Sequence, residues 1–228
     1  LVDRLVATFP NITSIKQNIN QTHSNVIMGD ESVTLYGKDQ IEDTLSDVRF
    51  KISDQSFYQI NTSQTEKLYQ KAIDYAALSG EETVLDTYCG IGTIGLYMAP
   101  QAKHVYGVEV VPEAITDAKE NATINGYQNT TFVCGKAEEV ILDWQSNGIK
   151  PDVVMVDPPR KGCDETFLDT LLALKPQKII YISCNPSTQQ RDALRLSSNY
   201  DLVQITPVDM FPHTTHVETV AQFIRKDV

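Results

Sequence analysis

The sequence is short of positive charge, of paired cysteines and of long apolar runs. No apolar stretch reaches the length that a membrane span requires, so we expect no membrane contact. None of the cysteines forms a C-x-x-C pair, which excludes a zinc knuckle or an iron–sulfur cluster held by this segment alone. The four cysteines are Cys89, Cys134, Cys163 and Cys184.

The beginning of the chain carries no initiator methionine and no signal peptide. It reads "LVDRLVATFPN", without the basic and then apolar segments that direct secretion. We therefore expect an internal fragment of a longer protein, located in the cytoplasm. Free thiols in a reducing compartment are the simplest interpretation of the unpaired cysteines.

The charge balance is acidic. The chain has 19 lysines and arginines against 30 aspartates and glutamates, which gives a net charge of -11. Nucleic-acid-binding proteins usually show a basic footprint, so this balance argues against such a partner. Apolar residues make up 41% of the chain and charged residues 21%, as is typical of a soluble globular protein.

Residues 1–50 differ from the rest of the chain in their pattern of apolar and polar residues. Short β-type pieces near Ser14–Asn18 and Ser32–Tyr36 are separated by polar turns that contain asparagine and glycine. We interpret residues 1–50 as the remnant of a preceding small β-containing domain, and residues 51–228 as the main domain.

The main domain begins with a helix and continues with alternating strands and helices. The helix is predicted from about Ser63, with Asn61, Thr62 or Ser63 as its cap. Five β–α units follow, which predict an α/β fold with a mostly parallel sheet covered on both faces. The last two strand-like runs, "DLVQITPVDM" and "VETVAQFIRK", have no helix between them and predict an antiparallel C-terminal hairpin.

The turn after the first strand of the main domain has the glycine spacing of a nucleotide site. In "LDTYCGIGTIG", Gly90, Gly92 and Gly95 follow the acidic Asp86. The spacing alone fits a dinucleotide site or a mere tight turn. A carboxylate beside the turn repels a diphosphate and suits the cationic sulfonium and amino group of S-adenosylmethionine, so we favour S-adenosylmethionine over NAD. Glu109, at the end of the next strand, suits the ribose hydroxyls.

Several motifs together resemble the RNA (uracil-5-)-methyltransferase family. The quoted stretches are "FYQIN", "VLDTYCGIGTIGL", "YGVEVVPEAITDAKENATINGYQN", "VDPPRKG", "YISCNPSTQQRD" and "HTTHVETVA". The resemblance covers about residues 50–226 and is greatest to the enzymes that make 5-methyluridine in 23S ribosomal RNA. It implies a Rossmann-like methyltransferase fold, S-adenosylmethionine as cofactor and RNA as partner, with ribosomal RNA favoured over transfer RNA. We expect a monomer.

The resemblance also implies the cofactor-contacting residues. They are Gln59, Tyr88, Glu109 and Asp157, to which the glycine turn adds Asp86, Gly90 and Gly92. Family members usually carry an upstream RNA-binding β-barrel of TRAM type, and some carry an upstream iron–sulfur cluster. Neither is present in these residues, which offers one explanation for the acidic charge.

Cys184 is the candidate nucleophile and Glu218 the candidate general base. Carbon 5 of uracil is a poor nucleophile until a thiolate adds to carbon 6, and a base must later remove the hydrogen from carbon 5. Cys184 follows a buried strand-like run, where helix-start amides would lower its pKa. A buried structural thiol fits Cys134 better, and Cys89 is expected to pack beneath the glycine turn.

Two alternative functions stay open, and the first of them comes from the "DPPR" motif. It is similar to the motif of amino-group methyltransferases, but Arg160 stands where those enzymes carry a stacking aromatic residue. We assign Arg160 and Lys161 to a phosphate or to the uracil carbonyl oxygens. A catalytically silent S-adenosylmethionine-binding RNA module is the other alternative, but it would need neither Cys184 nor Glu218.

Overall fold

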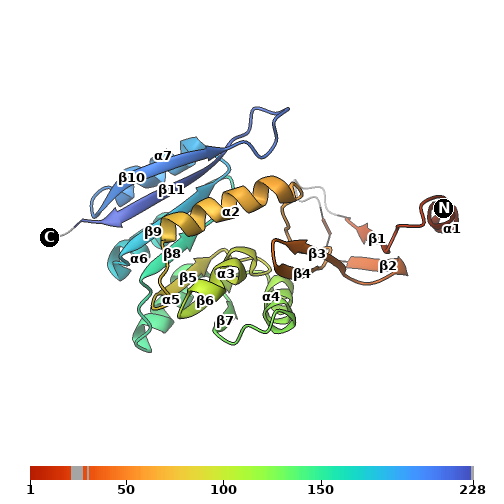
Figure 1. Ribbon diagram of the computed structural model, residues 1–228, viewed down its shortest axis with the longest axis horizontal. Helices are drawn as coiled ribbons and strands as arrows, with labels where there is room; N and C mark the ends of the chain where they lie inside the picture. The colour runs from red at the N-terminus through yellow and green to blue at the C-terminus, as the bar shows by residue number, and fades with distance from the viewer. Residues whose placement is uncertain (22–27, 30, 227–228) are drawn as a thin grey trace.

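A computed structural model describes residues 1–21, 28–29 and 31–226. Its body has three layers, a central sheet with helices on both faces, and a narrow N-terminal arm projects from it (Figure 1). The strands of the body's central sheet are β5 (Thr83–Thr87), β6 (His104–Glu109), β7 (Thr130–Cys134), β8 (Val153–Val156), β9 (Lys178–Ser183), β10 (Tyr200–Val208) and β11 (Glu218–Arg225).

The sheet has the order β10-β11-β9-β8-β5-β6-β7. Strands β5 to β9 are parallel to one another, and β11 is antiparallel to both β9 and β10. This confirms the predicted mostly parallel sheet with an antiparallel C-terminal hairpin. The register of β11 on β9 ends at the pair of Thr219 with Ser183.

Six helices and one short 3-10 turn surround the sheet in the described part of the chain. They are α2 (Thr62–Ala76), α3 (Thr93–Met98), η1 (Ala99–Gln101), α4 (Pro112–Ile124), α5 (Ala137–Ser146), α6 (Glu165–Leu174) and α7 (Pro186–Leu196). The predicted helix after residue 61 is confirmed, and its cap is Asn61, whose side chain accepts from the Gln64 amide. Pro112 opens α4, where its fixed φ suits a first turn.

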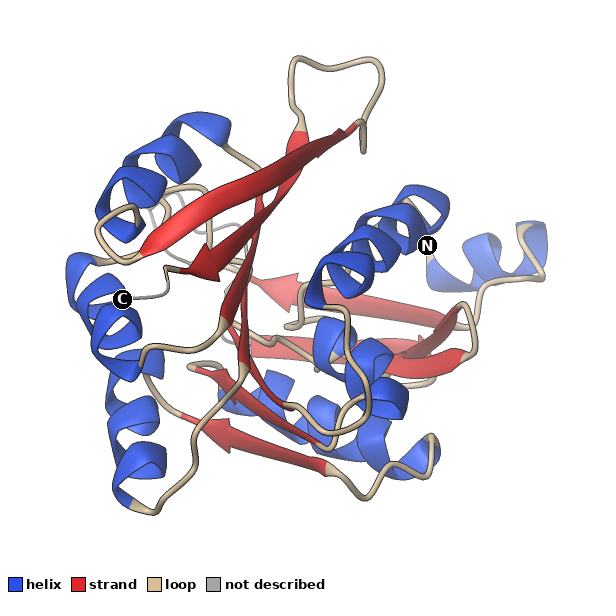
Figure 2. Ribbon diagram, turned by 60° about the vertical axis from the view of Figure 1, so that its left-hand side comes forward, coloured by secondary structure: helices blue, strands red, loops and turns tan. Residues whose placement is uncertain are grey.

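Neighbouring residues along each strand bury their side chains in opposite layers. Val84 packs with α2, α3 and α4, whereas Leu85 packs with α5, α6 and α7. Ile179 and Ile180 divide in the same way. This is why the parallel strands read as continuous apolar runs in the sequence. The view in Figure 2 shows helices on both sides of the red strands.

The N-terminal part contains a helix and two small antiparallel sheets. Its elements are α1 (Val2–Thr8), β1 (Ser14–Ile19), β2 (Glu31–Gly37), β3 (Ile41–Leu45) and β4 (Val48–Ile52). The predicted pieces near residues 14–18 and 32–36 are the β1–β2 pair, which lies in the arm (Figure 1). The β3–β4 hairpin instead packs on the body, because Leu45 and Phe50 are fully buried in the core that contains α2. The predicted division at residue 50 therefore falls within β4.

Asn121 of α4 and Asn125, the C-cap of that helix, bind the backbone of β4. The side-chain amide of Asn121 accepts from the Lys51 N–H at 2.8 Å and donates to the Lys51 carbonyl at 3.2 Å. Asn125 binds the Arg49 N–H and carbonyl in the same way, at 2.9 and 2.7 Å. These side chains satisfy the free edge of β4 as a neighbouring strand would.

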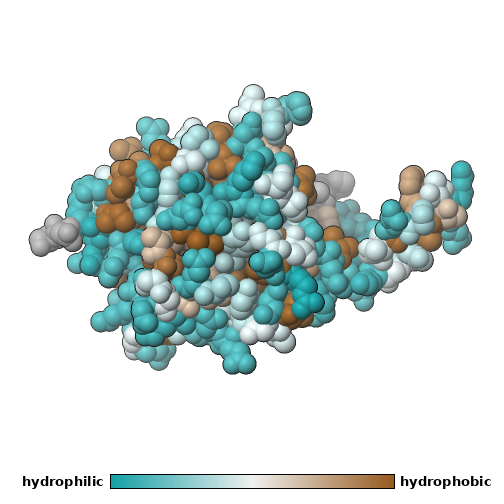
Figure 3. Space-filling view, viewed as in Figure 1, coloured by the Kyte–Doolittle hydropathy of each residue, from teal (hydrophilic) through white to brown (hydrophobic). Residues whose placement is uncertain are grey.

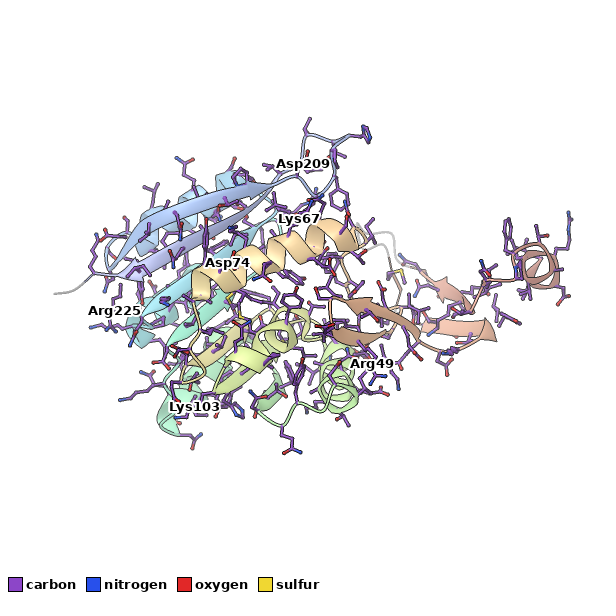
Figure 4. All side chains as sticks on the ribbon, in the orientation of Figure 1. Arg49, Lys67, Asp74, Lys103, Asp209 and Arg225 are labelled. Atoms are coloured by element: carbon purple, nitrogen blue, oxygen red, sulfur yellow. The ribbon has the colours of Figure 1, made fainter. Side chains whose placement is uncertain are left out.

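The surface shown in Figure 3 is mostly hydrophilic, with apolar residues scattered over the body and the arm. In the part of the chain that the structure describes, no helix has the length and apolar character that crossing a bilayer requires. Asp209 and Arg225, labelled in Figure 4, mark opposite ends of the C-terminal hairpin. The Asp209 end, which leads into the protruding loop 209–217, is the end at which the site lies.

Candidate active site

The fold brings five of the predicted residues to one edge of the sheet. Asp86 and Glu109 lie at the carboxyl ends of β5 and β6, and Asp157 and Cys184 directly follow β8 and β9. Glu218 opens β11, which runs in the opposite direction and therefore starts at the same edge. In sheets of this kind ligands bind beyond the carboxyl ends of the parallel strands.

The glycine turn leaves room for a ligand. Gly90 and Gly92 have φ values of +53° and +82°, which favour glycine. A methyl group added at Gly90 would meet no heavy atom of the described residues within 4 Å. At Gly92 it would approach the Phe132 ring to 3.0 Å. Gly90 therefore borders open space, whereas Gly92 is required for packing.

Asp86 is fully buried behind this turn. Its Oδ2 accepts a hydrogen bond from the Gly95 N–H of α3 at 2.8 Å. Its Oδ1 has no hydrogen-bond partner among the described residues. Burial raises the pKa of Asp86 to about 7, and the Glu109 carboxylate adds to the rise. An acceptor buried without a partner fits a ligand that brings a donor or a positive charge.

Glu109 is held by the backbone beside the same turn. Its Oε1 accepts from the N–H groups of Val110 and Val111 at 2.7 and 3.2 Å, and its Oε2 accepts from Gly90 at 3.3 Å. These bonds fix the carboxylate next to the glycine turn. Oε1 thus uses both of its lone pairs, whereas Oε2 keeps one for a ribose hydroxyl.

Gln59 and Tyr88 are less directly placed. Tyr88 has a φ of +61°, and its ring packs against Phe167 of α6 with a centroid distance of 5.4 Å. That ring therefore lies against the layer of α5, α6 and α7. Gln59 is half-buried in the segment that leads into α2.

Cys184 and Glu218 lie beside the last residue pair of the β9–β11 register. That pair is Ser183 with Thr219, so Cys184 directly follows its first member and Glu218 directly precedes its second. Both side chains are half-buried. The two groups are near enough for the charge of Glu218 to raise the pKa of the Cys184 thiol.

The pKa of the Cys184 thiol is raised, and the predicted lowering by helix-start amides is wrong. Burial has the largest effect, and the negative charges of Glu218 and Asp157 add to it. The Arg160 guanidinium opposes the rise. The acidic neighbours therefore outweigh the amides at the start of α7, and Arg160 is the residue that favours the thiolate.

The two carboxyl groups near Cys184 also have raised pKa values. Burial raises the pKa of Asp157 to about 8, with added contributions from Glu218 and Asp86. Burial raises the pKa of Glu218 too, against the opposing charge of Arg160. A carboxyl group with a raised pKa is a stronger base when ionised, as a general base near neutral pH requires.

The loop that carries Arg160 is attached to the start of α7. The Arg160 carbonyl accepts from Asn185 Nδ2 at 3.2 Å and from Thr188 Oγ1 at 3.3 Å. The Arg160 side chain is exposed. Lys161 forms an ion pair with Asp164, at 3.5 Å between Nζ and Oδ2, and does not contribute to the pKa shift of Cys184. The sequence suggested the same role for Arg160 and Lys161, but in the structure Arg160 acts on the Cys184 thiol, whereas Lys161 is paired with Asp164.

A buried aspartate that the sequence reading missed anchors the same loop. Asp192 is 1% exposed, and its Oδ2 accepts from the Cys163 N–H at 2.8 Å and from the Tyr181 hydroxyl at 2.7 Å. The neighbouring Arg191 donates to the Lys161 and Cys163 carbonyls. The sequence pattern could have revealed this residue, because Asp192 lies on the face of α7 that also buries Leu196, where an apolar residue is expected.

The other three thiols differ in their burial and in their contacts. Cys89 is buried beneath the glycine turn, as predicted. Cys134 is exposed, so its predicted burial is wrong; it ends β7, the edge strand of the sheet. Cys163 is buried and donates to the Tyr181 hydroxyl at 3.5 Å, although no partner was predicted. Within the described residues, no group of three His, Cys, Asp or Glu side chains is arranged to hold a metal ion.

Comparisons with known proteins cover nearly the whole chain. The family model described as tRNA (uracil-5-)-methyltransferase matches residues 11–226. An uncharacterized RNA methyltransferase of Staphylococcus epidermidis ATCC 12228 is 75% identical over 227 residues, which are 100% of this chain and 50% of that protein. One of Staphylococcus aureus MRSA252 is 75% identical over 223 residues, 98% of this chain and 49% of that protein. The chain spans about half the length of these curated relatives.

Solved structures that are similar to this chain include two tRNA methyltransferases. A Pyrococcus abyssi tRNA (uracil-54, C5)-methyltransferase in complex with S-adenosyl-L-homocysteine is 35% identical, with a TM-score of 0.80. The alignment covers 96% of this chain and 53% of that one. A tRNA m1G37 methyltransferase of M. jannaschii is 15% identical, with a TM-score of 0.65 over 87% of this chain and 61% of that one. At that identity the likeness concerns the fold alone.

Proposed function

This chain belongs to the tRNA (uracil-5-)-methyltransferase family, and from that premise we propose that the protein methylates carbon 5 of a uridine in RNA. The observation that carries the proposal is that Cys184 and Glu218 adjoin the same terminal residue pair, Ser183 with Thr219, at the carboxyl edge of the sheet, where the Glu218 charge acts on the thiol. A thiol and a carboxyl group in that relation are the nucleophile and base that the reaction needs. Because the chain spans about half of its relatives, the proposal concerns the full-length protein.

S-adenosylmethionine is the methyl donor in this proposal. The residues present fit it: Glu109 offers a lone pair of Oε2 for a ribose hydroxyl, and Gly90 leaves open space beside it. Asp86 offers a buried, unpartnered oxygen to a positive charge. When bound, this cofactor supplies the methyl group as an activated sulfonium. The residues of this chain bind it, orient it and provide the nucleophile and the base.

Cys184 begins the reaction. Its thiolate adds to carbon 6 of the uracil, forming a carbon–sulfur bond and shifting the electron pair of the 5,6 double bond into the ring as an enolate. Arg160, the cation that favours the thiolate, lies near this point and suits a uracil carbonyl oxygen on which negative charge develops. The enolate electron pair at carbon 5 then forms a bond to the methyl group, whose bond to the sulfonium breaks, and that sulfur would keep the bonding electrons and leave as a neutral thioether.

Glu218 ends the reaction. Its carboxylate removes the remaining hydrogen of carbon 5 as a proton, and the electron pair released re-forms the 5,6 double bond. The carbon–sulfur bond breaks, and Cys184 leaves as a thiolate. The raised pKa of Glu218 suits this step, because a carboxylate of ordinary pKa is a weaker base.

Ribosomal RNA stays our predicted substrate, and transfer RNA is the alternative. The family description and the Pyrococcus abyssi enzyme both name transfer RNA, which favours the alternative. In either RNA the target uracil must leave its stack to reach a half-buried thiol at the rim of the sheet.

The test is methylation by the full-length protein. Total RNA from a strain that lacks the gene is treated with the protein and S-adenosylmethionine, and the 5-methyluridine formed is mapped by mass spectrometry of ribosomal and transfer RNA separately. We expect 5-methyluridine at defined positions and none with Cys184→Ala. A methylated amino group in place of 5-methyluridine would refute the proposal and favour the amino-group alternative.

A further inference from the structure

Two buried polar side chains bind each other directly behind the Cys184–Glu218 pair. Thr219 of β11 is 5% exposed and Gln189 of α7 is 3% exposed. The Thr219 hydroxyl donates to Gln189 Oε1 at 2.8 Å and lies 3.3 Å from the Ser183 carbonyl. The last residue pair of the β9–β11 register is therefore joined by side chains as well as by the sheet.

Gln189 connects this pair to the interior of the sheet. Its Nε2 donates to the Tyr181 carbonyl of β9 at 3.0 Å. The amide of Gln189 thus links α7 to β9 through one atom and to β11 through the other. A fully satisfied buried network of this kind specifies one arrangement of the elements that it joins. Apolar side chains would pack here equally well without fixing the register.

Cys184 and Glu218 lie at the end of the sheet, where the relative position of two strands depends on contacts outside the sheet. Glu218 is the first residue of β11, and the exposed histidines His213 and His216 lie in the protruding loop 209–217 before it. The end of a strand pair beside an exposed loop opens more readily than its middle. Cys184 has additional support, since the Ser183 hydroxyl and the Asn185 backbone bond to each other at 3.0 Å.

We propose that Gln189 and Thr219 are positioning residues that hold Glu218 beside Cys184 for proton removal from carbon 5. The proposal rests on the proposed function. Glu218 is paired with Val208 of β10, and the Gln189–Thr219 bond ties the start of β11 to α7, the helix that follows Cys184. Loss of that bond therefore displaces the base relative to the nucleophile. Addition of the thiolate and methyl transfer then continue, whereas elimination slows and the methylated RNA stays bonded to Cys184.

The experiment uses the full-length protein and total RNA from the strain that lacks the gene. Thr219→Val removes the hydroxyl with little change of shape, and Thr219→Ser retains it. Thr170→Val is the matched control, since Thr170 is a buried threonine of α6 whose hydroxyl bonds within its own helix, to Thr166. The readouts are the covalent protein–RNA fraction on a denaturing gel and the single-turnover rate of methyl transfer.

We expect Thr219→Val to raise the covalent fraction about 10-fold or more at nearly unchanged methyl transfer, since small displacements of a reacting group cost that much or more. Thr219→Ser and Thr170→Val should resemble the wild type. In the double variant Gln189→Leu with Thr219→Val the buried Gln189 Oε1 is no longer left without its donor, so part of the folding stability that Thr219→Val loses should return. The double variant should still accumulate the covalent species.

A return of the double variant to the wild-type covalent fraction would show a role in stability alone and overturn the inference. An unchanged covalent fraction in folded Thr219→Val would overturn it as well. Failure of the proposed function is distinguishable, because RNA containing 5-fluorouridine would then form no adduct with the wild type, or would form one with Cys184→Ala.

Discussion

Cys184 and Glu218 adjoin the pair of Ser183 with Thr219 that ends the β9–β11 register, and the charge of Glu218 raises the pKa of the Cys184 thiol. The chain between them forms α7, β10 and the protruding loop 209–217. The antiparallel direction of β11 is what brings its first residue to the carboxyl end of β9. Four predictions follow from the groups gathered at this edge.

Cys184→Ala and Glu218→Gln should fail in different ways. Cys184→Ala lacks the nucleophile, so neither methyl transfer nor a covalent RNA adduct should occur. Glu218→Gln keeps the nucleophile, transfers the methyl group once and accumulates a covalent protein–RNA species, visible on a denaturing gel. Product formation by either variant should fall by at least about 100-fold. If the adduct of the wild type with 5-fluorouridine RNA mapped to Cys89, Cys134 or Cys163, the assignment of Cys184 would be wrong.

Arg160→Gln should slow the alkylation of Cys184. Arg160 is the cation that lowers the pKa of this thiol, so its loss raises that pKa further and reduces the thiolate present at a given pH. The rate of iodoacetamide labelling at Cys184, followed by mass spectrometry, should fall several-fold near pH 8, and its pH profile should move to higher pH. Lys161→Gln is the control, since Lys161 pairs with Asp164 and should leave the profile unchanged.

Glu109→Gln should weaken the binding of S-adenosylmethionine by about 10-fold or more, because hydrogen bonds to a charged acceptor are stronger than those to an amide. Calorimetric titration measures the change. Glu113→Gln, an exposed carboxylate in the first turn of α4, removes the same charge nearby and should bind as the wild type does. Equal affinity of both variants would refute the ribose assignment of Glu109.

The stability of the ligand-free protein should decrease as pH rises from about 4 to about 8. Asp86 has an ordinary pKa of 3.8, raised in the folded state to about 7, and Asp157 is raised from 3.8 to about 8. Between the two values of each group the folded state binds more protons than the unfolded state. Each carboxyl group therefore removes about 1.4 kcal/mol of stability per pH unit in its window.

Asp86→Asn should flatten this pH dependence, because it removes one of the two titrations. Thermal unfolding followed by circular dichroism at about pH 5 and about pH 8 measures the difference. Asp209→Asn, at an exposed carboxyl group marked in Figure 4, should retain the wild-type slope. A slope that Asp86→Asn leaves unchanged would show that the raised pKa of Asp86 does not control stability.

Much of the site follows from the sequence because parallel strands joined by helices must end at one edge. Asp86, Glu109, Asp157 and Cys184 each stand at the end of an apolar run that is followed by a helix, so the order of elements alone places them together. Cys134 shows the limit of that reasoning. Its strand-like run predicted burial, but β7 is the edge strand, and the order of strands across a sheet is not written in any one of them.

By itself the sequence determined the alternation of elements, the glycine turn, and the residue types of a thiol and a carboxyl group that a reaction can use. Only the tertiary structure decided that β11 enters between β9 and β10, which brings Glu218 to the edge of the sheet where Cys184 follows β9. It also decided that burial and acidic neighbours raise the pKa of Cys184 while Arg160 opposes them. Strand pairing and charge proximity depend on contacts between segments far apart in the chain, and local pattern carries no record of those contacts.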